Sequence, residues 1–297
     1  CLEVARALSM FDNLHAAELN LAGTIDASRF GSESQRIIAE AGEAVFGCYD
    51  RGQTRIRSEM ALQELLPRAI ANGDKKAIGD VWAAIVHSHS FALRWKQVQG
   101  SLEICMQHYR SQAKPVRFEI AHTRWQESWA LWNLGRWTSM IELSSELQES
   151  AKHRNDLFEW MSFSGGLGAS AWLALDQVKE CERIRKENAE TVASNVGIQI
   201  FDFAEWLAST HLQIYLGQFD RAWDVFRSLE RDLNRLPFSK VQLVRSSISV
   251  TGALICLHRL RESTRNQTVD QAQIRTTRKY LRNLKRERNP YCDAVGS

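Results

Sequence analysis

The sequence predicts an all-α protein, an α-solenoid of about six helix-turn-helix repeats. The first observation behind this prediction is an apolar pattern at offsets 0, 3, 7, 11 and 14, a spacing that stacks side chains along one face of a helix. In the 297-residue chain it starts at positions 38, 78, 118, 160, 200 and 241, which are 40 to 42 residues apart. Only four of its 30 positions are not apolar, namely Gly52, His89, His211 and Gly252.

The second observation is a turn that recurs in phase with this pattern. Gly135, Asp176 and Gly217 lie 41 residues apart, and each is followed by an apolar residue two positions later and another three positions beyond it. A period of about 40 residues with two helices per unit is typical of α-solenoids, in which each unit buries its face against the next. We therefore expect one elongated domain over residues 1–297.

The elements are expected in the following order. Residues 2–21 are predicted to form the second helix of an incomplete unit, followed by a loop that contains Gly23 and Gly31. Ser32 and Gln35 form a capping box for the helix of the first full repeat. A helix over about 54–71 should end at Asn72-Gly73-Asp74, which combines a stop signal with a new N-cap. Helix pairs then alternate through Leu260.

Prolines and β-branched residues fit this helical assignment. Pro115 and Pro237 lie three or four residues before the pattern starts at 118 and 241, where a helix cannot continue through them. The best strand signal is the β-branched stretch 241–250, but the helical register fits it better. Because the chain begins at Cys1 and ends just after Pro290 opens another helix, we expect a fragment of a longer protein.

Composition indicates a cytoplasmic protein. The six cysteines, at 1, 48, 105, 181, 256 and 292, are scattered without a CxxC motif, so we expect buried thiols in a reducing compartment. No apolar stretch approaches the roughly 18 residues of a membrane span. The N-terminus also lacks a basic-then-apolar signal pattern. The sequence therefore predicts no contact with a membrane.

Charge is concentrated at the C-terminal end. Residues 259–297 contain ten Lys and Arg against four Asp and Glu, whereas residues 1–258 contain 28 against 31. A basic terminal helix over 265–288 is ordinarily a solvated face. It can also form a surface for an anionic partner, built from Arg275, Arg278, Lys279, Arg282, Lys285 and Arg286.

Motifs for catalysis, cofactors or metals are missing from the sequence. Gly166, Gly168 and Ala171 match a relaxed GxGxxA pattern, but they lie inside the fourth helical repeat, where small residues for close helix packing are the better explanation. No GxxxxGK[ST] loop, kinase motif set, HExxH motif or GxSxG elbow occurs. We expect no enzymatic activity, no cofactor and no metal.

Histidines and tryptophans are interpreted as packing residues. His87 and His89 are two apart on a helix and cannot chelate one ion together. His89 and His211 occupy the same slot of the repeat, which predicts core-edge imidazoles bonded to a neighbouring helix. The ten tryptophans are expected mainly between repeats, and those on the inner curved surface are candidates for holding a partner.

A family resemblance accompanies this pattern. The stretch from Tyr215 to Trp223, YLGQFDRAW, resembles the LG-x-[YF]-x-x-A core of tetratricopeptide repeats, and Leu134-Gly-Arg-Trp137 is a less complete match. The longer unit is similar to the roughly 40-residue variant found after the ATPase module of STAND-type signalling proteins. Residues 215–260 and 282–291 resemble the C-terminal region of bacterial multidomain serine/threonine kinases.

The resemblance implies a right-handed superhelix that serves a signalling kinase as an interaction or regulatory domain. Its partner would be a protein or peptide, or the kinase and ATPase domains of the same protein, none of whose catalytic residues is in this chain. Two function classes stay open. One is a non-enzymatic protein-binding array, and the other is a nucleic-acid-binding helical repeat that uses the basic C-terminal helix, which we consider the less favoured of the two.

Overall fold

The computed structural model describes residues 2, 5, 13–49, 52–112, 116–192, 200–233, 239, 241–265 and 271–296. Within these ranges the regular structure is helical and contains no strand, which confirms the all-α prediction. Residues 242–250 of the β-branched stretch belong to a helix, as its register indicated. Pro115 and Pro237 lie outside the described residues.

The chain divides into two compact units, Cys1–Arg136 and Trp137–Ser297. The boundary falls between Arg136 and Trp137, next to the turn at Gly135 and within the third predicted hairpin. A single continuous array over residues 1–297 therefore stays a prediction, and each unit is described by itself.

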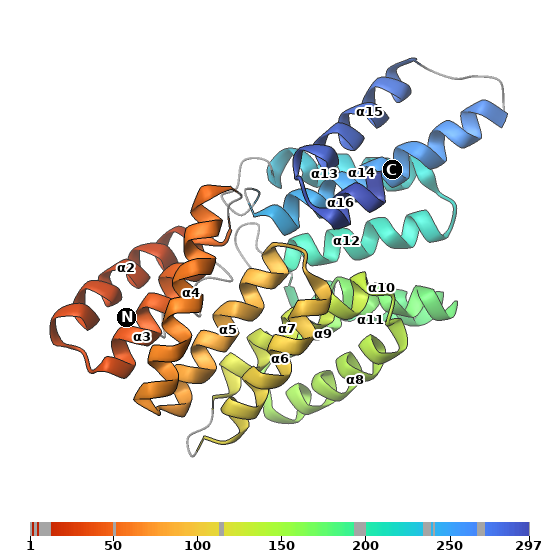
Figure 1. Cartoon of the computed structure of the whole chain (residues 1–297). Helices are drawn as coiled ribbons and strands as arrows, with labels where there is room; N and C mark the ends of the chain where they lie inside the picture. The colour runs from red at the N-terminus through yellow and green to blue at the C-terminus, as the bar shows by residue number, and fades with distance from the viewer. Residues whose placement is uncertain are drawn as a thin grey trace. The chain divides into compact units, whose positions relative to one another are not determined.

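Unit 1 is a series of helices in which each packs against the next along the chain (Figure 1). Helix α3 also packs against α5, and α5 against α7, so the first helices of successive pairs are in direct contact. The helices are α2 (Asn13–Phe30), α3 (Glu33–Gly47), α4 (Gln53–Asn72), α5 (Lys75–Phe91), α6 (Trp95–Arg110) and α7 (Arg117–Asn133).

The prediction of a loop around Gly23 is wrong, because α2 continues without a break to Phe30. Gly23 is buried, together with Ala16, Asn20 and Ala27, at positions that share one face of the helix. An isolated glycine costs a helix only about 1 kcal/mol relative to alanine, which burial of this face offsets. The chain leaves the helix at Gly31 instead.

The predicted caps of unit 1 are confirmed. The Ser32 side chain accepts a hydrogen bond from the Gln35 amide, and the Gln35 side chain accepts one from the Ser32 amide, which completes the capping box of α3. Gly73 ends α4 with φ of 75°, and Asp74 caps α5 by accepting from the amides of Lys76 and Ala77. Two helix ends are thus specified by three consecutive residues.

Helices in unit 2 also pack largely in chain order. Helix α8 contacts α9 and α10, α10 contacts α12, and α12 to α16 pack in chain order. The elements are α8 (Trp137–Arg154), α9 (Leu157–Ser164), α10 (Leu167–Ala171), η1 (Trp172–Leu175), α11 (Val178–Val192), α12 (Ile200–Tyr215), α13 (Phe219–Leu233), α14 (Gln242–Arg265), α15 (Gln271–Arg286) and α16 (Pro290–Gly296).

The six pattern starts coincide with the first helices of successive pairs. Positions 38, 78, 118, 160 and 200 lie in α3, α5, α7, α9 and α12, and 241 directly precedes α14. The fourth of these helices is interrupted at Gly165 and Gly166, which the uniform pattern did not predict. Gly166 has φ of 55°, and a Cβ there would lie 2.6 Å from Cβ of Ala204. Close approach of α12 to this glycine confirms the packing explanation of the GxGxxA stretch.

Candidate binding surfaces

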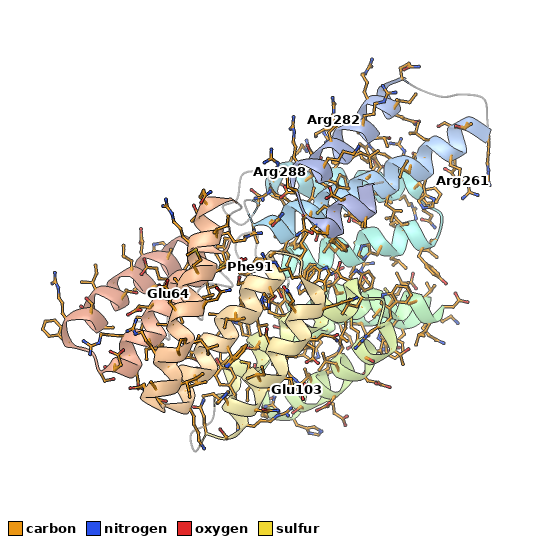
Figure 2. The ribbon with its side chains drawn as sticks, viewed as in Figure 1. Glu64, Phe91, Glu103, Arg261, Arg282 and Arg288 are labelled. Carbon is orange, nitrogen blue, oxygen red and sulfur yellow. The ribbon has the colours of Figure 1, made fainter. Side chains whose placement is uncertain are left out.

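A row of aromatic and imidazole rings crosses the first helices of unit 1. Phe46 lies on α3, Tyr49 follows that helix, His87 and Phe91 lie on α5, and Phe118 and His122 lie on α7; we call these six residues the aromatic row. Consecutive rings are in contact, with centroids 4.5 to 5.9 Å apart. His87 and Phe91 are buried and the other four are half-buried, so the row lies at the edge of the core. Figure 2 labels Phe91 at the C-terminal end of α5.

Two imidazoles meet at the centre of the aromatic row. Nε2 of His87 lies 3.4 Å from Nε2 of His122, and the ring centroids are 4.5 Å apart. Nδ1 of His87 lies 2.7 Å from the Ala83 carbonyl oxygen, which can only accept, so this nitrogen carries a proton. In the neutral ring, Nε2 of His87 then presents its lone pair to His122.

A polar network joins α4 to α5 near the row. The Ser88 hydroxyl donates to Glu59 Oε1 at 3.4 Å, and Arg94 forms an ion pair with Glu59 Oε2 at 3.1 Å. Burial raises the pKa of the adjacent Cys48 thiol. A thiol held in its neutral form is a packing group rather than a nucleophile. The described cysteines, at 48, 105, 181, 256 and 292, are all buried free thiols.

The predicted anionic-partner surface lies on α15. Its six residues, Arg275, Arg278, Lys279, Arg282, Lys285 and Arg286, are all exposed to solvent. Their spacing of three and four places them on one side of the helix, and the opposite side buries Tyr280 and Leu284. In Figure 2 the labelled Arg282 side chain projects away from α15. We call this set the basic face.

Some cations of the basic face already have partners within the chain, and Arg282 Nε donates to the Arg278 carbonyl oxygen at 3.2 Å. Lys279 Nζ lies 3.8 Å from Glu230 Oε1 and 5.1 Å from the centre of the Tyr280 ring. Helix α15 itself contains no acidic residue. The predicted span 265–288 starts too early, since Arg265 is the last residue of α14 and α15 begins at Gln271.

The three predicted turn residues adopt the same backbone conformation. Gly135, Asp176 and Gly217 have φ of 70°, 58° and 70°, and Leu93, with φ of 58°, occupies the equivalent turn of unit 1. At each turn the next residue's amide donates to a carbonyl five residues earlier, as Gln218 does to Gln213. These residues shape the hairpins.

The histidines of the shared repeat slot bond to neighbouring helices, which confirms that prediction. Nδ1 of His89 lies 3.0 Å from the Ser101 hydroxyl on α6, and Nδ1 of His211 lies 3.1 Å from the Ser170 hydroxyl on α10. Burial lowers the pKa of His89, and it lowers the pKa of His211 to about 4. Both imidazoles are therefore neutral near pH 7.

Nine of the ten tryptophans are buried or half-buried, as packing residues are. Trp95, Trp129, Trp160 and Trp206 are buried, whereas Trp137 is 42% exposed. The rest are half-buried, at positions 82, 125, 132, 172 and 223. Trp223 is covered by the guanidinium groups of Arg227 and Arg259, at 5.6 and 5.4 Å from its ring centre.

Sequence reasoning missed the pairing of His87 with His122. These residues are 35 positions apart, which is not the repeat period, and the spacing of His87 and His89 concerns one helix only. The available signal was that 87 and 122 both fall on first helices of adjacent repeats.

Comparison of the chain with protein-family models, with curated proteins and with solved structures finds no match in any of the three. Among the described helices, none combines the length and apolar character needed to cross a bilayer. In the same part of the chain, no group of three or more His, Cys, Asp or Glu side chains is arranged to hold a metal ion.

Proposed function

We propose that the chain is a non-enzymatic interaction domain that binds a peptide segment of a protein partner along the aromatic row. The observation that carries the proposal is the continuity of ring contacts across α3, α5 and α7. Aromatic side chains supply large contact area with little conformational entropy to lose, and they are enriched where interfaces are strongest. Solenoids bind partners on the surface made by equivalent helices of successive repeats.

Selection from a defined peptide library with the 297-residue chain tests this proposal. We expect a selected peptide to bind saturably and to lose at least about tenfold in affinity in Phe118→Ala and His122→Ala, because each half-buried ring contributes at least about 1.4 kcal/mol. The matched control is Ile70→Ala, which removes an apolar residue that is 58% exposed on α4, outside the aromatic row. No saturable peptide, or equal binding by all variants, contradicts the proposal.

The α-solenoid arrangement is the architectural part of the proposal. Its support is the placement of the six pattern starts at the first helices of successive pairs and the direct packing of α3 on α5 and α5 on α7. Small-angle scattering tests it. A radius of gyration near the roughly 19 Å of a compact globule of this length contradicts an elongated superhelix.

We also propose that this domain serves a larger bacterial signalling protein of the serine/threonine kinase or STAND type. The support is the tetratricopeptide-like stretch from Tyr215 to Trp223, which forms the turn between α12 and α13. The gene tests this proposal. Kinase or ATPase motifs in the same reading frame support it, and a reading frame without them contradicts it.

The second candidate function is binding of a nucleic acid by the basic face. It is favoured by six cations on one side of a helix without an acidic residue. Phosphate binding releases counterions, so affinity must fall steeply with salt. In Arg275→Gln and Arg278→Gln we expect the slope of log affinity against log salt to fall by about one for each phosphate that is no longer neutralised. Lys186→Gln on α11, 80% exposed, is the control that leaves the slope unchanged.

A further inference from the structure

Two imidazole nitrogens converge from different helices at the centre of the aromatic row. Nε2 of His87 on α5 and Nε2 of His122 on α7 are 3.4 Å apart. Two nitrogens that bind one Zn²⁺ ion in tetrahedral geometry, each at about 2.0–2.1 Å, are separated by about 3.4 Å. The spacing of the two histidines matches this edge of a tetrahedron.

The hydrogen bonding of His87 agrees with the role of a metal ligand. A metal-binding histidine almost always donates its other ring N–H to a carbonyl or carboxylate, which fixes the tautomer and the ring orientation. Nδ1 of His87 makes this bond with the Ala83 carbonyl oxygen at 2.7 Å. The ring is also held by Phe91, whose centroid is 5.9 Å away. One ligand is therefore preorganised.

His122 is the adjustable member of the pair. It is half-buried and stacks on Phe118 with the ring planes 26° apart, while its plane is inclined by 45° to that of His87. To bind a metal, His122 carries its proton on Nδ1, and rotation of its ring turns the Nε2 lone pair toward the point that the His87 lone pair faces. Partial exposure of His122 also gives an ion and its water ligands access to the pair.

We propose that His87 and His122 bind a transition-metal ion, with Zn²⁺ the best fit, through their Nε2 atoms. Water completes the coordination sphere, since the described residues place no third His, Cys, Asp or Glu ligand here. Such a site leaves coordination positions open to water, unlike the closed four-ligand sites of structural zinc. The ion connects α5 to α7, and its affinity falls at acid pH because protons compete for both nitrogens.

Titration of the 297-residue chain with Zn²⁺ alone, followed by calorimetry, tests the proposal, and Co²⁺ serves as the spectroscopic probe. We expect one equivalent of Zn²⁺ to bind. With Co²⁺ we expect the strong visible absorption of a tetrahedral ion, without a sulfur charge-transfer band. His122→Gln should weaken binding by at least about tenfold and abolish the tetrahedral spectrum.

Two further variants keep the test decisive. His87→Gln should behave like His122→Gln, and if the buried substitution prevents folding, His122→Gln decides by itself because its side chain is half-buried. His153→Gln removes an exposed histidine of α8 and should leave binding unchanged. The proposal is overturned by the absence of saturable binding, by a cobalt spectrum that shows sulfur ligation, or by equal affinity in His122→Gln and the wild-type chain.

Discussion

Both units contain a buried tyrosine that donates to a carboxylate and packs on a helix glycine. In unit 1, Tyr109 on α6 donates to Asp80 at 2.8 Å, and Lys76 pairs with the same carboxylate at 3.1 Å. A Cβ on Gly79 would lie 2.7 Å from the Tyr109 ring, so the ring can pack here only because glycine has no side chain. Both partners belong to one hairpin, α5–α6, which the tyrosine closes.

In unit 2 the same chemistry joins different hairpins. Tyr280 on α15 donates at 2.8 Å to Glu230 on α13, the preceding hairpin. A Cβ on Gly252 would lie 2.8 Å from both Tyr280 and Phe226, so α13, α14 and α15 meet at this ring. Burial and the Glu230 carboxylate raise the pKa of Tyr280, which keeps its hydroxyl protonated as a donor. One polar motif can therefore stabilise a helical hairpin internally or couple successive hairpins.

The largest expected effect comes from removing the Phe226 ring, which lies at the centre of a cluster of aromatic rings in unit 2. Phe226 is fully buried, and its ring lies 5.3 to 5.6 Å from those of Trp206, Trp223 and Tyr280. Phe226→Ala should lower the free energy of unfolding by about 3–5 kcal/mol, because a cavity replaces the packed ring. Denaturant unfolding measures the loss, and hydrogen exchange should accelerate in α12–α15.

Phe30→Ala is the control for Phe226→Ala, since it removes the same ring from a position at the end of α2 where it is 85% exposed. Its free energy of unfolding should stay within about 0.5 kcal/mol of the wild-type value. A decrease below about 1 kcal/mol in Phe226→Ala would show that the cluster does not couple the helices of unit 2.

The next effect depends on pH and concerns His211 of unit 2. Its pKa in the folded chain is about 4, against an ordinary value near 6.5, so the unfolded chain binds the proton more tightly. The contribution of neutral, buried His211 to the free energy of unfolding is complete above about pH 6.5 and is lost as the pH falls toward 4. For a half-buried ring we expect about 2 kcal/mol over this window. His211→Gln should remove that part of the pH dependence in urea unfolding, whereas His153→Gln should retain it.

The tyrosine comparison itself is tested by removing one oxygen. Tyr280→Phe and Tyr109→Phe should each lower the free energy of unfolding by about 1–3 kcal/mol, because a buried carboxylate loses a donor. Hydrogen exchange should rise in both α13 and α15 for Tyr280→Phe, but only within α5 and α6 for Tyr109→Phe. Identical exchange patterns confined to one hairpin would refute the distinction between the two units.

The smallest effect concerns the glycine beside the ring. Gly79→Ala should cost about 1–2 kcal/mol, since overpacking against Tyr109 exceeds the gain in helix propensity. Gly100 on α6 is the matched control, because a Cβ there meets nothing within 4 Å. Gly100→Ala should therefore increase stability by up to about 1 kcal/mol. Thermal unfolding separates the two, and an increase in both variants would show that the ring can move aside.

The helix ends that depend on interactions between neighbouring residues were predicted correctly from the sequence. Gly73 and Asp74 end one helix and start the next through backbone conformation and a side-chain cap, which need no distant partner. It was wrong at Gly23, because burial of one face of α2 outweighs the weak helix propensity of glycine. It did not predict the break at Gly166, because Ala204 contacts that glycine from another helix.

Of the two candidate surfaces, one was likewise predictable from local sequence and the other depends on contacts between distant helices. The basic face of α15 was predictable because all six cations lie on one helix, where a spacing of three and four specifies a common side. The aromatic row was not, since it depends on how α3, α5 and α7 are rotated against one another. A one-dimensional pattern contains no information about that rotation.

Helical structure, several helix ends and an apolar pattern with a period of about 41 residues follow from the amino-acid sequence alone. Hydrogen bonds and capping within a few residues are sufficient for these features. The meeting of His87 with His122 and the reach of Tyr280 to Glu230 arise only in the folded chain. Such contacts depend on the packing of whole helix faces, where small shifts in rotation choose between neighbouring side chains.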